Sequence, residues 1–298
     1  MSSKVSHIQG MGLLVYGIIN SIVFALIAIG FALVYGISRQ PNFAHGALYV
    51  LAGFLTWTFL VKLGLNYAAS VVLSLMIVAG LGVALYRFLL MRIRGMEASE
   101  IIASFAIGLA IMEGLRFFGF RGKTYTLPAF VEGTATIATI PVDFQRLIII
   151  GIGIVLVALL WLFTHYTKLG LALRAIAQDE RAALMLGIDS DLAALIALTL
   201  GSALAGLAAI AILPLGNITV ETGYDILINA IAVCIIGGLG SWGGAVLASF
   251  ILGFAQMLTV YFIGAQWHVV VALLAIIIIL IVRPSGLLAR QKELEERV

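Results

Sequence analysis

Charged residues and cysteine are both scarce in this chain. Asp, Glu, Lys and Arg make up only 10% of its 298 residues, whereas a soluble domain carries roughly a quarter. Cys234 is the single cysteine, which excludes a secreted disulfide scaffold and a metal centre built on cysteine spacing. Residues 273–282 are continuously apolar, whereas the strands of an outer-membrane barrel alternate apolar and polar residues.

What the chain has in excess is apolar surface. Of its residues 63% are apolar and the mean hydropathy is +1.18, which is more than one soluble globule of this length can bury. A bilayer-spanning helix needs about 20 apolar residues. The predicted fold class is therefore all-α, a polytopic membrane helix bundle. Lys, Arg, Asp and Glu are absent from six stretches that are long enough for a span, residues 5–38, 40–61, 63–86, 147–167, 192–220 and 226–282.

We expect about eight to ten transmembrane or half-spanning helices, because the longest stretch holds more than one span. Residues 225–240 are few and end in glycines, so they are a candidate half-span. No polar domain interrupts the apolar runs, so residues 1–298 are predicted to form a single transmembrane permease-like domain. The predicted spans lie near residues 12–36, 45–63, 67–90, 101–119, 146–166, 190–214, 225–240, 243–263 and 266–283.

Lys and Arg are distributed unevenly between two sets of loops. Cytoplasmic loops carry an excess of these residues, so the richer set, together with the C-terminus, is predicted to be cytoplasmic. The segment at residues 120–145 then forms an external loop. The richer set contains Arg39, Arg87, Arg92, Arg94, Lys168, Arg174, Arg181, Arg283, Arg290, Lys292 and Arg297. The other set contains Lys4, Lys62, Arg116, Arg121, Lys123 and Arg146.

The loop at residues 167–190 is too polar to span a membrane and is rich in Ala and Leu, which favour helix. We predict two short helices, with Asp179 in a turn or N-cap position and Gly187 as a C-terminal stop. Two such helices at the membrane surface form a compact knob that fits a groove on a partner protein. The alternative is an amphipathic interfacial loop that only covers the ends of two spans.

Four motifs resemble those of one family of transport proteins. From Gly170 to Ile188 the chain follows the pattern Gly-x3-Arg-Ala-x-Ala-x-Asp-x3-Ala-x3-Gly-Ile, which is similar to the coupling loop of ATP-binding-cassette (ABC) importer permeases. Within these, the chain resembles the branched-chain amino acid permeases of the Liv-H type, and the resemblance runs over nearly the whole chain. The other resembling segments are residues 26–36 with 42–46, residues 237–245 and residues 283–288.

This resemblance implies a permease subunit that moves branched-chain or related amino acids across the bacterial inner membrane by alternating access. The implied partners are two cytoplasmic ATPase subunits, a second related permease subunit, a periplasmic or extracellular solute-binding protein and membrane lipid. ATP hydrolysis would belong to the ATPase subunits, so no catalytic residue, cofactor, metal or nucleic acid is expected for this chain. The residues implied at the ATPase contact are Gly170, Arg174, Asp179, Ala183 and Gly187.

The segment from Gln40 to Gly46 predicts a break followed by a helix start, because Pro41 disfavours helix before it and suits a first helical turn. Two interpretations remain open. In the first, the broken helix lines a cavity, so Asn42, His45 and Gly46 are candidates for the translocation path. In the second, the segment is a cytoplasmic turn in which Asn42 caps the helix and His45 bonds a backbone carbonyl.

Small residues at a spacing of four predict a seam of close helix packing near the C-terminal end. Packing is preferred there over substrate contact, because small side chains let two helices approach closely in a membrane. The residues assigned to this seam are Gly240, Gly244, Ser249 and Gly253.

Polar residues inside apolar runs are costly in hydrocarbon and often functional. Glu113 and Arg116 stand at helical spacing and are expected to pair, with a proton relay as the alternative. Asn229 is a candidate for the translocation path or for a hydrogen bond between helices. The alternative function is a self-contained secondary transporter or channel for a small polar solute such as urea or an amide. Its ion coupling would have to rest on Glu113 or Asp225.

Overall fold

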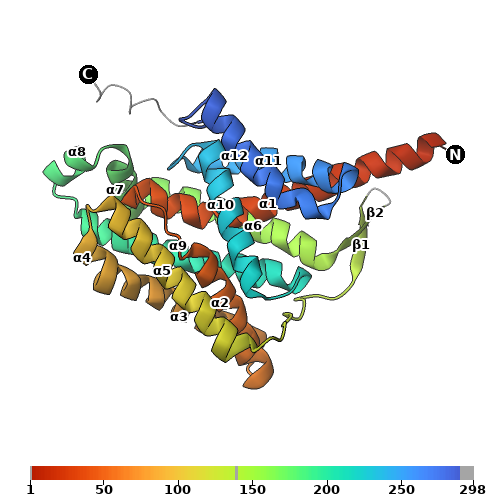
Figure 1. The fold of residues 1–298 in the computed structure, drawn as a ribbon, viewed down its shortest axis with the longest axis horizontal. Coiled ribbons are helices and arrows are strands. Elements are labelled where there is room, and N and C mark those ends of the chain that lie inside the picture. Colours follow the sequence, from red (N-terminus) through yellow and green to blue (C-terminus); the bar gives the residue numbers. More distant parts are fainter. Residues whose placement is uncertain (1, 138–139, 289–298) are drawn as a thin grey trace.

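The computed structural model describes residues 2–137 and 140–288, and these are mainly helical (Figure 1). The strands β1 and β2 form one antiparallel hairpin, with Thr134 opposite Asp143. In chain order the elements are α1 (Ser2–Ser38), α2 (His45–Trp57), η1 (Thr58–Lys62), α3 (Tyr67–Leu85), η2 (Tyr86–Leu90), α4 (Met91–Ile93), α5 (Glu97–Gly114), η3 (Leu115–Phe120), β1 (Thr134–Ile137), β2 (Ile140–Asp143), α6 (Phe144–Tyr166), α7 (Lys168–Gln178), α8 (Glu180–Met185), α9 (Ser190–Ile212), η4 (Leu213–Leu215), α10 (Val220–Gly237), α11 (Trp242–Phe262), η5 (Ala265–Trp267) and α12 (His268–Val282).

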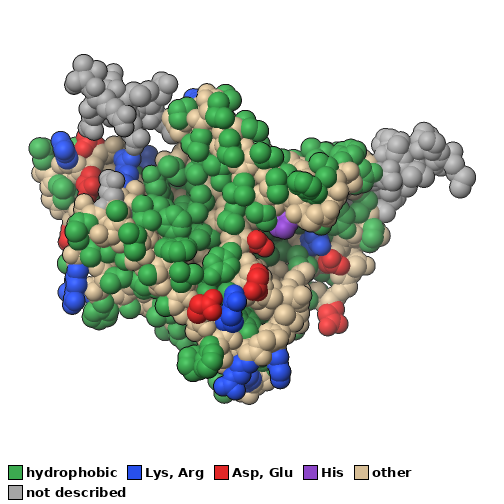
Figure 2. Space-filling model, viewed as in Figure 1, with side chains coloured by type: hydrophobic (Ala, Val, Ile, Leu, Met, Phe, Trp, Pro, Cys, Tyr) green, Lys and Arg blue, Asp and Glu red, His purple; other side chains and the backbone are tan. Residues whose placement is uncertain are grey.

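Eight helices in the described part of the chain are long and apolar enough to cross a membrane. This confirms the predicted all-α membrane bundle. The helix formed by α2 and η1 is not one of the eight. Figure 2 shows hydrophobic side chains over much of the visible face, with charged ones at its left edge, in its lower part and on its right side.

The candidate half-span near residues 225–240 is a longer helix. Helix α10 begins at Val220 because the side chain of Thr219 accepts a hydrogen bond from the Thr222 N–H (3.2 Å) and caps the helix. With 18 residues, α10 is long enough to be one of the eight candidate spans. The sequence pattern missed its first turns because Glu221 and Asp225 interrupt the apolar run there.

Helix α1 lies at the centre of the bundle. Of its most apolar window 78% is buried, against 6% for α12 at the periphery. Glycines let the neighbouring helices approach α1 closely. A Cβ on Gly253 of α11 would lie 2.6 Å from the Cα of Ser21 in α1, and a Cβ on Gly30 of α1 would lie 2.9 Å from the carbonyl oxygen of Gly201 in α9. This close approach agrees with the packing predicted for Gly253.

The bundle has two distinct ends, with α7 and α8 at one and the β1–β2 hairpin at the other (Figure 1). At the first end, Arg39 donates a hydrogen bond to the Ala177 carbonyl (2.8 Å), and the Leu287 N–H donates one to the Ile236 carbonyl (2.9 Å). At the second end, the Ile218 N–H donates one to the Tyr125 carbonyl (2.7 Å).

The Arg39–Ala177 contact, together with an ion pair between Arg94 and Glu180 (2.9 Å), shows that the loops near residue 39, at 87–100 and at 167–190 lie together, as the basic residues predicted. The chain just after residue 283 joins the same end, since Gly286 lies against Gly238. The predicted cytoplasmic residues Arg290, Lys292 and Arg297 lie outside the described residues, as does the side chain of Lys4.

Candidate functional site

Helices α7 and α8 form the knob that the loop composition predicted. Helix α7 begins where the Thr167 hydroxyl accepts a hydrogen bond from the Gly170 N–H (3.0 Å). Helix α8 begins at Glu180, after the N-cap residue Asp179, whose carboxylate accepts a hydrogen bond from the Ala182 N–H (3.0 Å). Both the two short helices and the N-cap position of Asp179 are therefore confirmed.

Two glycines determine how the knob joins the bundle. A Cβ on Gly170 would lie 2.5 Å from the Cα of Thr164, so only glycine lets α7 fold back against the end of α6. At the other end Gly187 has φ +79°, a left-handed conformation that favours glycine. The Ile188 N–H donates to the Ala183 carbonyl (3.1 Å) and closes α8, which confirms Gly187 as a helix stop.

The knob has an inner and an outer face. Ala183 is buried and packs in one cluster with Leu173 of α7 and Leu33 of α1, so its side chain faces this chain rather than outward. Met185 and Leu186 at the tip are 88% and 80% exposed. Of the residues that the resemblance assigned to a partner contact, Gly170 and Ala183 are buried, Arg174 is half-buried, and Asp179 and Gly187 are exposed.

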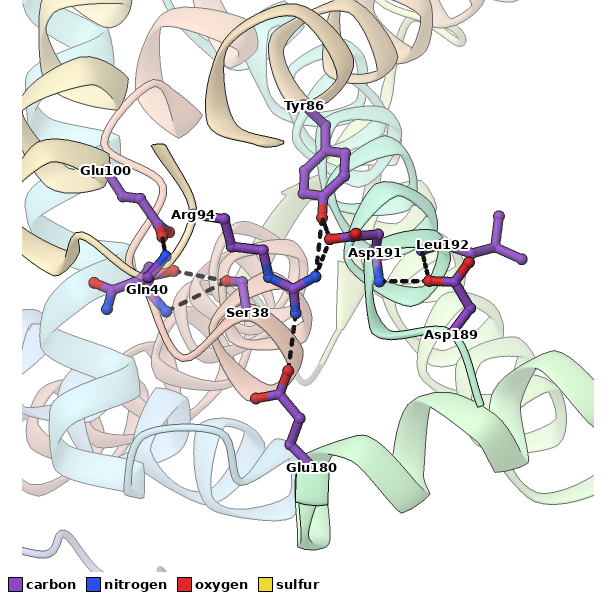
Figure 3. Close-up of polar contacts among 10 residues, drawn as sticks. Ser38, Gln40, Tyr86, Arg94, Glu100, Glu180, Asp189, Asp191 and Leu192 are labelled. Atoms are coloured by element: carbon purple, nitrogen blue, oxygen red, sulfur yellow. Dashed lines mark hydrogen bonds and ion pairs between the residues drawn. The ribbon is translucent and has the colours of Figure 1, made fainter. Parts of the chain in front are cut away.

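Arg94 ties the knob to two long helices (Figure 3). Its guanidinium donates to Glu180 of α8 (2.9 Å) and also pairs with Asp191 in the first turn of α9. The Tyr86 hydroxyl, at the end of the α3 span, donates to the same Asp191 carboxylate (2.9 Å). Asp191 is held in place because the Asp189 side chain accepts its backbone N–H (2.8 Å). The start of α8 is thereby linked to α3 and α9 through one side chain.

The Arg94 guanidinium in this cluster stays charged. Burial by itself lowers the pKa of the Arg94 guanidinium, but its hydrogen bond to Asp191 and the nearby carboxylates raise the pKa overall. Beside Arg94 lies a cavity of about 40 Å³, whose walls include Ser38 and Asn42. Sequence analysis missed Tyr86, Arg94, Glu180 and Asp191 as a group, because no local pattern pairs residues that lie 86 to 105 positions apart.

Replacing Arg94 by methionine is expected to loosen α8 without unfolding the bundle. The change removes the Arg94–Glu180 pair, which is worth about 1 kcal/mol at this partly exposed position, so local opening of α8 should become roughly fivefold more frequent. Hydrogen–deuterium exchange of the α8 amides measures this opening. Arg92→Met, at an exposed position two residues away, is the matched control. Unchanged exchange in Arg94→Met would show that Arg94 does not hold the knob.

The segment at Asn42 and His45 has the geometry of a braced turn. The Asn42 side chain accepts the Ala44 N–H (3.1 Å), and His45 Nε2 lies 3.0 Å from the Ile27 carbonyl, where its ring is fully buried. A Cβ on Gly46 would clash with the carbonyl oxygen of Gly223 in α10. The His45 contact agrees with the interpretation in which His45 bonds a backbone carbonyl. Asn42 braces the turn before α2, but it is not the helix cap predicted there, because the N-cap position of α2 is Ala44.

The other polar candidates in the apolar runs form contacts within their own helix or with neighbouring helices. Gln256 of α11 donates to the side chain of Asn229 in α10 (3.0 Å), and both are buried. Glu113 and Arg116 form the predicted pair (3.6 Å), and Arg116 also reaches Glu221 of α10 (3.3 Å). All three charged side chains are more than half exposed.

The predicted small-residue seam follows α11 and the turn before it. A Cβ on Gly240 would lie 3.2 Å from the Cα of Gly36 in α1, and one on Gly244 would lie 2.8 Å from the backbone of Gly237 in α10. Ser249 is fully buried, and its hydroxyl donates to the Val246 carbonyl (2.6 Å). These close approaches agree with the packing predicted for Gly240 and Gly244.

Comparison with known proteins places this architecture in a family. The family model described as "Branched-chain amino acid transport system / permease component" matches residues 13–281. The high-affinity branched-chain amino acid transport system permease protein BraD of Pseudomonas aeruginosa is 30% identical, over 93% of this chain and 95% of its own. The corresponding protein LivH of Escherichia coli is 27% identical, over 90% of this chain and 91% of its own.

A solved structure shows the same fold. PsaBC from Streptococcus pneumoniae, in complex with a Fab, matches with a TM-score of 0.51 at 14% sequence identity and covers 99% of both chains. At that sequence identity the match shows only that the two proteins share a fold. The family is shown by the family model, which matches nearly the whole chain, and by the 30% identity to a named permease. This chain therefore belongs to the family of branched-chain amino acid transport system permease components.

Proposed function

We propose that this chain is the membrane-spanning permease subunit of an ABC importer for branched-chain or related amino acids in the bacterial inner membrane. The observation that carries the proposal is the α7–α8 knob, whose exposed tip at Met185 and Leu186 projects from one end of the bundle while its base is tied to three long helices. Relatives named as branched-chain amino acid transport permeases support the substrate class.

In this proposal two cytoplasmic ATPase subunits grip the knob, one on this chain and one on a second related permease. The end with α7 and α8 then faces the cytoplasm, along with the C-terminus, and the β1–β2 hairpin faces outward. Basic loops at the knob end support this orientation. An external solute-binding protein would deliver the amino acid to the hairpin end. Residues 1–298 would act as one transmembrane domain.

The contacts of the knob provide a route for force. When the ATPases close, α8 moves with them, and the Arg94 contacts transmit that motion to Asp191 in α9 and Tyr86 at the end of α3. The tight turn at Gly170 transmits it to α6. Alternating access would follow from the tilting of α3, α6 and α9 against the central helix α1. ATP hydrolysis takes place on the partner subunits.

Reconstituted transport tests the proposal. The whole complex, purified from cells that produce all its subunits, is expected to take up leucine into liposomes only when ATP is present with the ATPase subunits. Uptake by this chain and its permease partner alone should remain at background, with or without a proton or sodium gradient. Robust gradient-driven uptake without ATPase subunits would contradict the proposal and favour a self-contained secondary transporter.

A further inference from the structure

A basic pocket lies at the hairpin end of the bundle, far from the knob and unused by the proposed coupling. It has a volume of about 440 Å³. Figure 2 shows Lys and Arg side chains gathered at the lower tip of the molecule, where α2 and α5 end in Figure 1. The residues that line the basic pocket are Trp57, Lys62, Phe118, Gly119, Arg121, Lys123 and Tyr125.

A tight turn after η3 builds one wall of the pocket. Arg121 has φ +50° and Gly122 has φ +75°, so two consecutive residues adopt the left-handed conformation. For arginine this conformation is uncommon and points to a local constraint. The Lys123 N–H donates to the Phe120 carbonyl (2.9 Å), and the chain therefore turns back toward α2. Both basic side chains are placed at the rim by this turn.

Aromatic rings form the floor of the pocket. The rings of Trp57 and Tyr125 have centroids 3.8 Å apart, and the Phe120 ring stacks on Tyr125 at 5.8 Å. Tyr125 is pinned to the bundle, since its carbonyl accepts the Ile218 N–H (2.7 Å). The Lys62 ammonium lies 5.4 Å from the centre of the Trp57 ring. The floor is therefore rigid, and one cation is already held over it.

The cations of the pocket are not neutralised. Lys62, Arg121 and Lys123 are exposed, and none of them pairs with a carboxylate in residues 2–137 and 140–288. Arg116, in η3 just before this turn, differs from these three residues because it pairs with Glu113 and Glu221. Three unpaired positive charges around one pocket attract an anion, and Lys and Arg are the side chains that recognise phosphate.

The pocket also adjoins a strongly apolar surface. Phe117 and Phe118 are 72% and 73% exposed, and Val61 and Leu63 at the end of η1 are exposed as well. Trp and Tyr rings are typical of the level where a membrane meets water. A ligand there would meet cations at one end and hydrocarbon contacts at the other. An acidic protein surface would satisfy the cations but not the apolar side chains beside them.

We infer that the basic pocket binds the phosphate-bearing headgroup of an anionic membrane phospholipid. Lys62, Arg121 and Lys123 hold the phosphate, and the acyl chains lie along Val61, Phe117 and Phe118. The inference is independent of the transported substrate. Lys and Arg are usually more frequent in the cytoplasmic loops, and in the proposed orientation these three residues lie at the external end. The inference explains their presence there by lipid recognition.

Quenching of Trp57 fluorescence tests the inference. The full chain, with Trp161, Trp242 and Trp267 replaced by phenylalanine, is placed in bilayers of phosphatidylcholine that contain brominated phosphatidylglycerol or brominated phosphatidylcholine. Brominated phosphatidylglycerol is expected to quench at about tenfold lower mole fraction. The triple variant Lys62→Gln/Arg121→Gln/Lys123→Gln should lose this preference. Arg146→Gln, at the same end but paired with Asp143 (3.2 Å), should retain it.

Two other sources of anion are separated by the same measurement. If inorganic phosphate changes Trp57 fluorescence in phosphatidylcholine bilayers and brominated phosphatidylglycerol is not preferred, the ligand is a soluble phosphate and the inference fails. If both lipids quench equally and inorganic phosphate has no effect, the three cations bind a protein partner instead. That result also contradicts the inference. If the tryptophan replacements prevent folding, native mass spectrometry of phosphatidylglycerol retained by the unaltered chain and the triple variant gives the same decision.

Discussion

Gly187→Trp is expected to abolish ATP-driven uptake while the chain remains folded in the membrane. No atom lies within 4 Å of a Cβ built on Gly187, so the indole ring would project from the tip of the knob beside Met185 and Leu186. In the proposed function it would there obstruct the groove of the ATPase subunit that receives the knob. Uptake into liposomes and stimulation of ATPase activity by substrate measure the effect, and the amount of chain in the membrane is measured by immunoblot.

Gly187→Asn is the matched control for this prediction. Asparagine tolerates the left-handed conformation that Gly187 adopts and adds little bulk, so most of the uptake should remain. Full activity of Gly187→Trp would show that the tip of the knob does not enter a partner. Equal loss in both variants would instead assign the effect to the φ +79° backbone of Gly187, because it would not depend on side-chain size.

Gly46→Val is expected to prevent the chain from reaching its folded state. The Cβ of valine would clash with the Gly223 carbonyl, and this backbone of α10 cannot rotate away as a flexible side chain can. Overpacking of this kind costs roughly 3 kcal/mol or more, a large part of the stability of a typical protein. Size-exclusion chromatography in detergent and a thermal unfolding curve should show aggregation or a strongly lowered Tm.

Gly80→Val separates this effect from a general intolerance of valine. Gly80 lies in a helix of similar apolar character, but no atom lies within 4 Å of its Cβ position, so Tm should hardly change. A Gly46→Val protein with normal Tm but no uptake would refute the packing role. That result would return Gly46, with Asn42 and His45, to the translocation path.

Local signals were sufficient for the helices and for the knob. Six long charge-free stretches identified the membrane bundle, since only length and polarity decide whether a helix can cross a bilayer. Asp179 and Gly187 marked the ends of α8, because capping depends on the residues within one turn. The first turns of α10 were missed because Glu221 and Asp225 resemble a loop in composition, although Thr219 caps a helix there.

The site was only partly predictable. Both interpretations of Asn42 and His45 need the same residues at the same helix break, so no pattern could choose between them. The hydrogen bond of His45 to the carbonyl of Ile27, 18 residues earlier, agrees with the second interpretation. The Arg94 cluster left no sequence signal, because Arg94, Glu180 and Asp191 each look like ordinary charges at a helix end.

By itself, the sequence determined that this protein is a membrane helix bundle, where its knob lies and which permeases it resembles, because hydropathy, capping and motif spacing act over short stretches of chain. Only the tertiary structure decided that Arg94 contacts Glu180 and Asp191, that Gly46 lies against α10, and that three cations at the end opposite the knob surround one aromatic pocket. Each of these depends on side chains from separate helices meeting in space, and such meetings follow from the packing of the whole bundle.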